Sequence, residues 1–179
     1  MVFEMFFVRQ AYTQILAHEL KKTVRMLHAF PVERFDAREP DCGASARELA
    51  LGFVARVRRI HEIAYGPGTH LVRTRVPSRG EILLALESAF LGAHSALATL
   101  PATRWQEVIQ APIGLPTLRQ ARRGELLWLS LRELIRHSRH FALHARSVTH
   151  GGGAKTLVGS RPVPAATPEP VVGELAFGA

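Results

Sequence analysis

The sequence predicts an all-α protein, a bundle of four helices followed by a tail. Apolar residues recur with the helical period in four separate segments. A Ser-x-x-Glu capping box precedes two of these segments, and glycine or proline follows each of the four. A chain of 179 residues is long enough for one domain with its own core. We therefore expect a helical domain over residues 1–150 and a tail over residues 151–179.

The first two helices are predicted from their apolar period and their ends. Apolar residues recur across residues 15–27, and Pro31 ends that helix. The sequence "SARE" at 45–48 has the spacing in which a serine hydroxyl and a glutamate carboxylate satisfy each other's backbone amides. A second helix is expected to begin there and to end at "YGPG", residues 65–68.

The remaining helices are separated by a long connection. "SRGE" at 78–81 is a second capping box, and the helix that it begins is expected to reach Pro101. Residues 101–120 contain two further prolines and are expected to form a connection with one turn of helix. The longest helix is predicted over residues 122–147, closed by "GGG" at 151–153. The tail after it is rich in Gly, Pro, Ala and Val and is expected to be extended or disordered.

Composition favours a cytoplasmic protein. The single cysteine, Cys42, excludes an intrachain disulfide and fits a reducing compartment. The N-terminal "MVFEMFFVRQ" lacks the basic leader of a signal peptide. No segment is judged to reach the roughly 20 apolar residues that cross a bilayer, so no membrane partner is expected.

The formal net charge of +8, carried mostly by arginine, raises the alternative of nucleic-acid binding. Acidic residues are interspersed among the arginines, and no helix-turn-helix or aromatic stacking motif is present, which argues against a nucleic-acid partner. The arginines of this candidate face are Arg56, Arg58, Arg59, Arg119, Arg122, Arg123, Arg132 and Arg139.

Four of the nine histidines lie in "ELIRHSRHFALHARSVTHGG", residues 133–152. On a helical wheel Glu133, His137, His140 and His144 form a stripe beside the predicted core face, with separations of three or four residues. Side chains stacked in this way can share a metal ion if another helix supplies a further ligand. The alternative is that the histidines border the solvated side of the helix. The predicted core face consists of Leu127, Leu131, Leu134, Ser138, Phe141, Ala145 and Val148, and the solvated side is marked by Arg132, Arg136, Arg139 and Arg146.

Four segments together resemble the DinB/YfiT-like superfamily of bacterial four-helix-bundle proteins. "SARELALGFVARVRR" is similar to the start of that family's second helix, and "PSRGEILLALESAFLGAHSALATLP" to its third. "RRGELLWLSLRELIRHSRHFALHAR" is similar to the last helix, and "GGGAKTLVGSRP" to the glycine-lysine segment that follows it. The resemblance covers most of residues 1–160 and rests on loose patterns of apolar and small residues.

The resemblance implies an up-down-down-up bundle that forms a homodimer and holds a divalent metal ion, such as zinc, nickel or iron. One histidine of the second helix and two of the last helix are the usual ligands. Some members are transferases that use a low-molecular-weight thiol, so a metal-dependent thiol transferase or a hydrolase-like enzyme is implied. A bound metal would lower the pKa of a thiol or water and make it nucleophilic at neutral pH.

This sequence departs from the family pattern at the ligand positions. Gly52 stands where the second-helix histidine is expected. On the last helix the pair can be His137 with Glu133, or His140 with His144; a third register, which pairs His140 with Arg136, is excluded because a guanidinium does not bind metals. The alternative function is therefore a metal-free relative, a dimeric or stress-related protein that binds a small molecule in the bundle.

Overall fold

The computed structural model describes residues 2–38, 43–66, 76–112 and 120–150, and within these ranges the chain is mostly helical. The predicted tail, together with Cys42 and Arg119, lies outside the described residues. The elements in chain order are α1 (Val2–Ala29), the 3-10 turn η1 (Val32–Arg34), α2 (Ala46–Tyr65), α3 (Arg79–Thr99), α4 (Ala102–Trp105), β1 (Val108–Gln110), β2 (Gln120–Arg122) and α5 (Arg123–His150).

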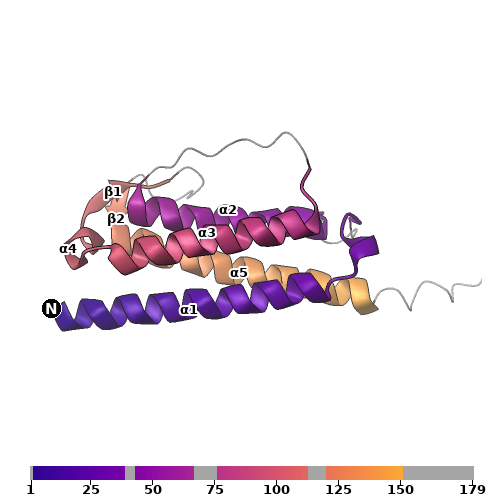
Figure 1. The fold of residues 1–179 in the computed structure, drawn as a ribbon, viewed down its shortest axis with the longest axis horizontal. Helices are drawn as coiled ribbons and strands as arrows, with labels where there is room; N and C mark the ends of the chain where they lie inside the picture. The colour runs from indigo at the N-terminus through magenta and orange to yellow at the C-terminus, as the bar shows by residue number, and fades with distance from the viewer. Residues whose placement is uncertain (1, 39–42, 67–75, 113–119, 151–179) are drawn as a thin grey trace, which may run out of the picture.

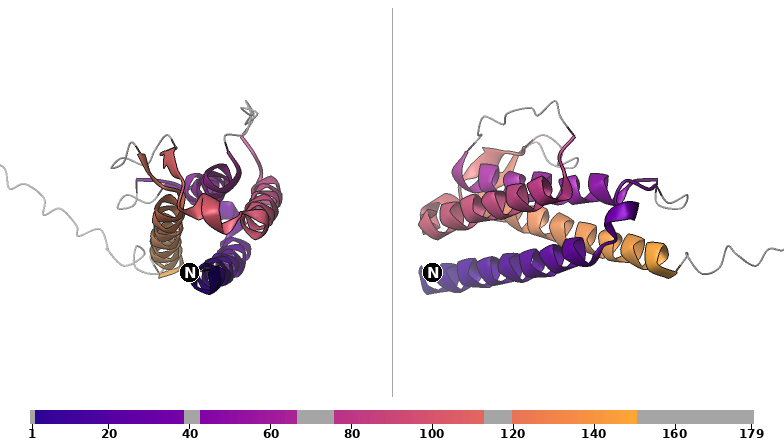
Figure 2. Two further views of the ribbon diagram at one scale, coloured as in Figure 1. Left: turned by 90° about the vertical axis from the view of Figure 1, so that its left-hand side faces the viewer. Right: turned by 45° about the vertical axis from the view of Figure 1, so that its right-hand side comes forward.

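The long helices α1, α2, α3 and α5 lie side by side around one core (Figure 1). In that view α1 and α5 run from left to right, and α2 and α3 run in the opposite direction. Helix α2 packs against α3 and α5, and α1 packs against the same two helices from the other side. The end-on view in Figure 2 shows the same order around the centre. Buried apolar side chains from all of them fill this centre.

Both predicted capping boxes are confirmed. The Ser45 hydroxyl accepts from the Glu48 amide at 3.2 Å, and the Glu48 carboxylate accepts from the Ser45 amide at 2.7 Å. Ser78 and Glu81 make the same two contacts at the start of α3, at 3.2 and 2.7 Å. The starts of α2 and α3 agree with the predicted ones because these boundary signals are local and do not depend on tertiary contacts. Helix α1 differs, since it begins at Val2, well before the apolar period over residues 15–27 from which it was predicted.

The connection between α3 and α5 contains more structure than the sequence predicts. Helix α4 supplies the expected single turn. Beyond it, β1 and β2 pair as an antiparallel ribbon in which Ile109 lies opposite Ala121. Strands of three residues are too short to show an alternating pattern, so the sequence carries no signal for them.

Arg123 joins this connection to the end of α2. Its guanidinium donates to the carbonyls of Ile63 and Ala64 in the last turn of α2, and to the Glu107 carboxylate at 2.8 Å. A cation at a helix C-terminus is favourable because the last carbonyls of the helix lack amide partners. The residue is only 3% exposed, so its predicted place in a solvent-facing arginine surface is wrong.

Helix α3 is the one helix among the described residues that is long and apolar enough to cross a membrane by length and composition. The expectation that no segment reaches this length was therefore too strict. The core helix of a soluble protein meets the same criterion, although only 33% of the apolar window of α3 is buried here. Leu84 and Leu91 account for much of its exposed apolar surface, with exposures of 67% and 66%.

Candidate functional site

His137 lies in the contact between α5 and α2. Its Nε2 is 2.7 Å from the carbonyl oxygen of Leu49, and its ring packs edge-on against Phe53, with 4.6 Å between the ring centroids. A carbonyl oxygen only accepts, so this geometry places the proton on Nε2, which donates it. The side chain is buried, with 8% exposure. The alternative that the histidines border the solvated side of the helix is therefore wrong for this residue.

Gly52 is the residue that makes room for this ring. A Cβ atom built on Gly52 would lie 2.6 Å from Nε2 of His137 and 2.8 Å from its Cε1. Real Cβ atoms essentially never come so close to another heavy atom. The two positions that the family resemblance pairs through a metal therefore face each other directly, and the imidazole occupies the space of the missing side chain.

Charges around His137 oppose its protonation. Burial is the main cause that lowers the pKa of His137 from 6.5 to about 4, and the positive charges of Arg56 and His140 lower it further. The hydrogen bond to Leu49 acts in the opposite direction. Arg56 is half-buried and donates to the Gly52 carbonyl at 3.0 Å. Its own pKa is lowered by burial and by Arg59. The imidazole is thus neutral at physiological pH.

His144 is a core residue at the contact between α5 and the end of α1. It is fully buried, and its ring stacks on Phe30 at the end of α1 with 5.8 Å between centroids and an interplanar angle of 5°. Phe30 also packs on Phe141, which in turn packs on Phe53, with 5.7 Å between the ring centroids in both pairs. The two buried histidines therefore lie on either side of an aromatic cluster. The alternative that the histidines border the solvated side of the helix is wrong for His144 as well.

The other two candidate ligands lie nearer to solvent. His140 is exposed, and its ring centroid lies 6.5 Å from that of His137. Glu133 is partly exposed and lies 4.0 Å from the guanidinium of Arg136, a distance at the limit for an ion pair. The structure thus brings His137 and His140 near each other and places His144 against α1.

These residues fit a metal ion poorly in this arrangement. Nε2 of His137 donates to Leu49, so only Nδ1 of this ring has a lone pair for an ion. Gly52 supplies no ligand from α2. Within residues 2–38, 43–66, 76–112 and 120–150, no three His, Cys, Asp or Glu side chains are grouped so that they could hold an ion.

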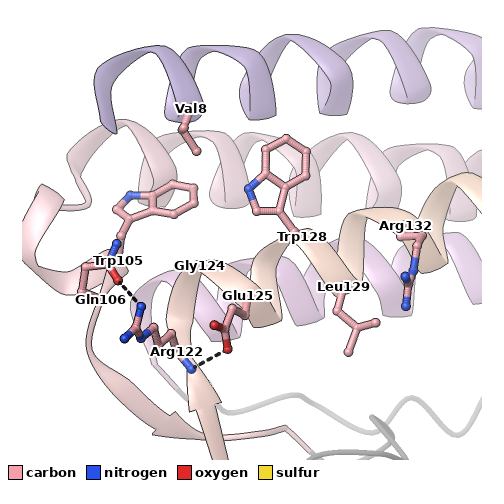
Figure 3. A pocket seen from close by; sticks show the side chains of 9 residues that line it. All are labelled: Val8, Trp105, Gln106, Arg122, Gly124, Glu125, Trp128, Leu129 and Arg132. Carbon is pink, nitrogen blue, oxygen red and sulfur yellow. Dashed lines mark hydrogen bonds between the residues drawn. The ribbon is translucent and has the colours of Figure 1, made fainter. Parts of the chain in front are cut away.

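A second site, which the sequence did not predict, is an open pocket of about 740 Å³ beside the first turns of α5 (Figure 3). Its walls come from α1, from the end of α4 and the residue after it, from the end of β2 and from α5. The signal in the sequence was that one tryptophan lies in the proline-rich connection and the other soon after it. The residues that line the pocket are Val8, Trp105, Gln106, Arg122, Gly124, Glu125, Trp128, Leu129 and Arg132.

A scan against models of known protein families and a search of curated proteins find no match to this chain.

We predict that Gly52→Ala destabilises the protein by about 1–3 kcal/mol, because the new methyl group forces the His137 ring out of its place. Gly92→Ala in α3 is the matched control. Its Cβ would meet no atom closer than 3.5 Å, so the gain in helix propensity should stabilise the protein by about 0.5–1 kcal/mol. Urea denaturation measures both changes.

The cause is checked in a His137→Ala background. There the ring is absent, so Gly52→Ala should lose its cost and should become neutral or stabilising. An equal cost of Gly52→Ala in both backgrounds would contradict the steric explanation.

We further predict that the neutral state of His137 makes stability depend on pH. The folded-state pKa is about 4 and the unfolded value is 6.5, so the unfolded chain binds the proton more tightly. The free energy of unfolding that depends on the neutral state of His137 is fully present above pH 6.5. It is lost as the pH falls towards 4, by about 2–3 kcal/mol in total. The measurement is the free energy of unfolding of the parent minus that of His137→Gln between these pH values. A flat difference would show that His137 titrates alike in both states.

Proposed function

We propose that this chain is a DinB/YfiT-like protein that works without a metal ion, as a soluble, cytoplasmic, dimeric protein that binds a small molecule. The observation that carries this proposal is the position of the His137 ring directly against Gly52. The family resemblance expects a second ligand at that position of α2, and glycine has no side chain to supply one.

The arrangement of the helices supports the resemblance. In Figure 1, α1 and α5 run in one direction and α2 and α3 in the other, which supports the up-down-down-up arrangement that the resemblance implies. Gly52 and His137 face each other, as the metal ligands of that family are expected to do.

The pocket at the start of α5 supports a binding role. Ligand sites for small molecules are concave, largely apolar and have volumes of about 300–1,000 Å³, and the pocket of about 740 Å³ falls within that range. None of its lining residues is His137 or another of the candidate ligands, so a ligand there needs neither His137 nor a metal ion.

Helix α3 supports a homodimer. Leu84 and Leu91 are two helical turns apart and lie on the same face, with exposures of 67% and 66%. Ser88, Ser95 and Ala98 are exposed beside the two leucines, and the exposed Glu87 and His94 border this face. Exposed leucines grouped on one face of a helix are typical of an interaction surface. A second copy of the chain can cover them, because a two-fold contact brings the same patch of both copies together.

We predict that protein purified without a histidine tag and incubated with Zn²⁺, Ni²⁺ or Fe²⁺ retains less than about one-tenth of an ion per chain after desalting. Plasma mass spectrometry measures this content. The His137→Ala/His144→Ala variant should give the same low value. A stoichiometric ion in the parent that is lost in the variant would overturn the metal-free proposal in favour of the thiol-transferase alternative.

We predict that the parent is a dimer in size-exclusion chromatography with light scattering, and that Leu84→Glu/Leu91→Glu is a monomer. Two buried carboxylates cannot be desolvated without partners. Leu143→Glu on α5 is the matched control, because Leu143 is similarly exposed, at 61%, and lies outside this face of α3. A monomeric parent, or a dimer that survives the double substitution, would contradict the role of α3. A monomer that sediments with lipid vesicles would instead assign this face to a membrane.

A further inference from the structure

The pocket at the start of α5 has an aromatic wall made by Trp105 and Trp128 (Figure 3). These are the only tryptophans of the chain. Trp105 is buried, with 3% exposure, whereas Trp128 is 38% exposed and presents part of its ring to the opening. Val8 and Leu129 complete the apolar lining.

The two indole rings are held in place before any ligand arrives. Tyr12 packs edge-on against both rings, with centroid distances of 6.1 Å to Trp105 and 5.2 Å to Trp128. Tyr12 is itself fixed because its hydroxyl donates to the Leu127 carbonyl at 3.0 Å. Gly124 lets Trp105 approach α5, since a Cβ there would lie 3.0 Å from Cε3 of the indole. A wall fixed in this way loses little entropy when a flat ligand stacks on it.

The charged groups of the pocket favour an anion. Arg122 and Arg132 contribute two positive charges and Glu125 contributes one negative charge. The Glu125 carboxylate lies 3.4 Å from the backbone amide of Arg122, where it caps the helix, and the Arg122 guanidinium donates to the Gln106 side chain at 3.3 Å. The positive end of the α5 dipole adds to this field. Among the described residues, no ion pair engages Arg132.

We propose that this pocket binds a planar aromatic carboxylate, whose ring stacks on the exposed part of the Trp128 indole while its carboxylate pairs with Arg132 or Arg122. This inference rests on the proposed binding function and specifies its ligand class. An indole face is a good surface for stacking another ring, and a guanidinium can pair with a carboxylate through two parallel hydrogen bonds.

The test uses naphthalene-2-carboxylate as the probe, with two matched compounds. Naphthalene-2-carboxamide keeps the ring system and removes the charge, and cyclohexanecarboxylate keeps the charge and removes the aromatic ring. Calorimetric titration into the full-length protein should give binding of the naphthoate, with affinity reduced about tenfold for each of the other two.

The location of binding is measured by ¹⁹F NMR of protein labelled with 5-fluorotryptophan. The chain then has two fluorine resonances, both from the pocket wall, and Trp128→Phe assigns them. Both resonances should shift when the naphthoate is added.

Arg132→Gln should weaken naphthoate binding about fivefold to tenfold and leave carboxamide binding unchanged. Arg136→Gln is the matched control. Arg136 is an exposed arginine one turn further along α5 and does not line the pocket. Arg122→Gln separates the contribution of the second guanidinium. Trp128→Ala should weaken both the naphthoate and the carboxamide.

Equal affinity for the naphthoate and the carboxamide would overturn the proposal, as would naphthoate binding that leaves both fluorine resonances in place. Absence of naphthoate binding up to about 1 mM would also overturn it. These failures are distinguishable from failure of the proposed function. A stoichiometric metal ion would refute the metal-free proposal even if the naphthoate binds. Binding of a different small molecule without metal would support that proposal while refuting this ligand class.

Discussion

The contact between Gly52 and the His137 ring is the constraint on which the α2–α5 side of the molecule depends. Because Gly52 has no Cβ, the imidazole lies flush against α2 and donates to the Leu49 carbonyl. The same placement puts its edge on Phe53, which packs on Phe141. The absence of a side chain at Gly52 therefore allows α5 to approach α2 closely. It also determines which ring nitrogen of His137 carries the proton and where this ring meets the aromatic core.

This constraint also bears on metal chemistry. The hydrogen bond to Leu49 occupies Nε2 of His137 and leaves only Nδ1 for an ion, so it does not by itself prevent coordination. A complete structural zinc site supplies about 10–16 kcal/mol, but only when its ligands are all present. The number of ligands is therefore decisive. With a glycine on α2 and His144 stacked on Phe30, His137 lacks partners for an ion.

The parts of the fold that the sequence predicted are those with local signals. Capping boxes and the helical period placed the helix boundaries because those contacts join residues close in the chain. The burial of His137 and His144 was missed because a helical wheel gives an angle and does not show which helix packs there. Arg123 was misplaced for the same reason, since its carbonyl partners belong to the end of α2, about 60 residues earlier. The tryptophan pocket requires α1, α4, β2 and α5 to meet, and no local pattern encodes that meeting.

The two sites nevertheless share a construction that connects sequence to structure. At each, a glycine of a long helix faces an aromatic ring of another element: Gly52 faces His137, and Gly124, the second residue of α5, faces Trp105. In the interior of a helix, as at Gly52, a glycine costs about 0.5–1 kcal/mol relative to alanine. The room that it leaves for the His137 ring offsets this cost. At Gly92, where a Cβ meets no atom closer than 3.5 Å, no such close contact is present. Close contact with a ring therefore distinguishes Gly52 and Gly124 from Gly92. The ring belongs to another helix, so the sequence around a glycine does not show whether such a contact is present.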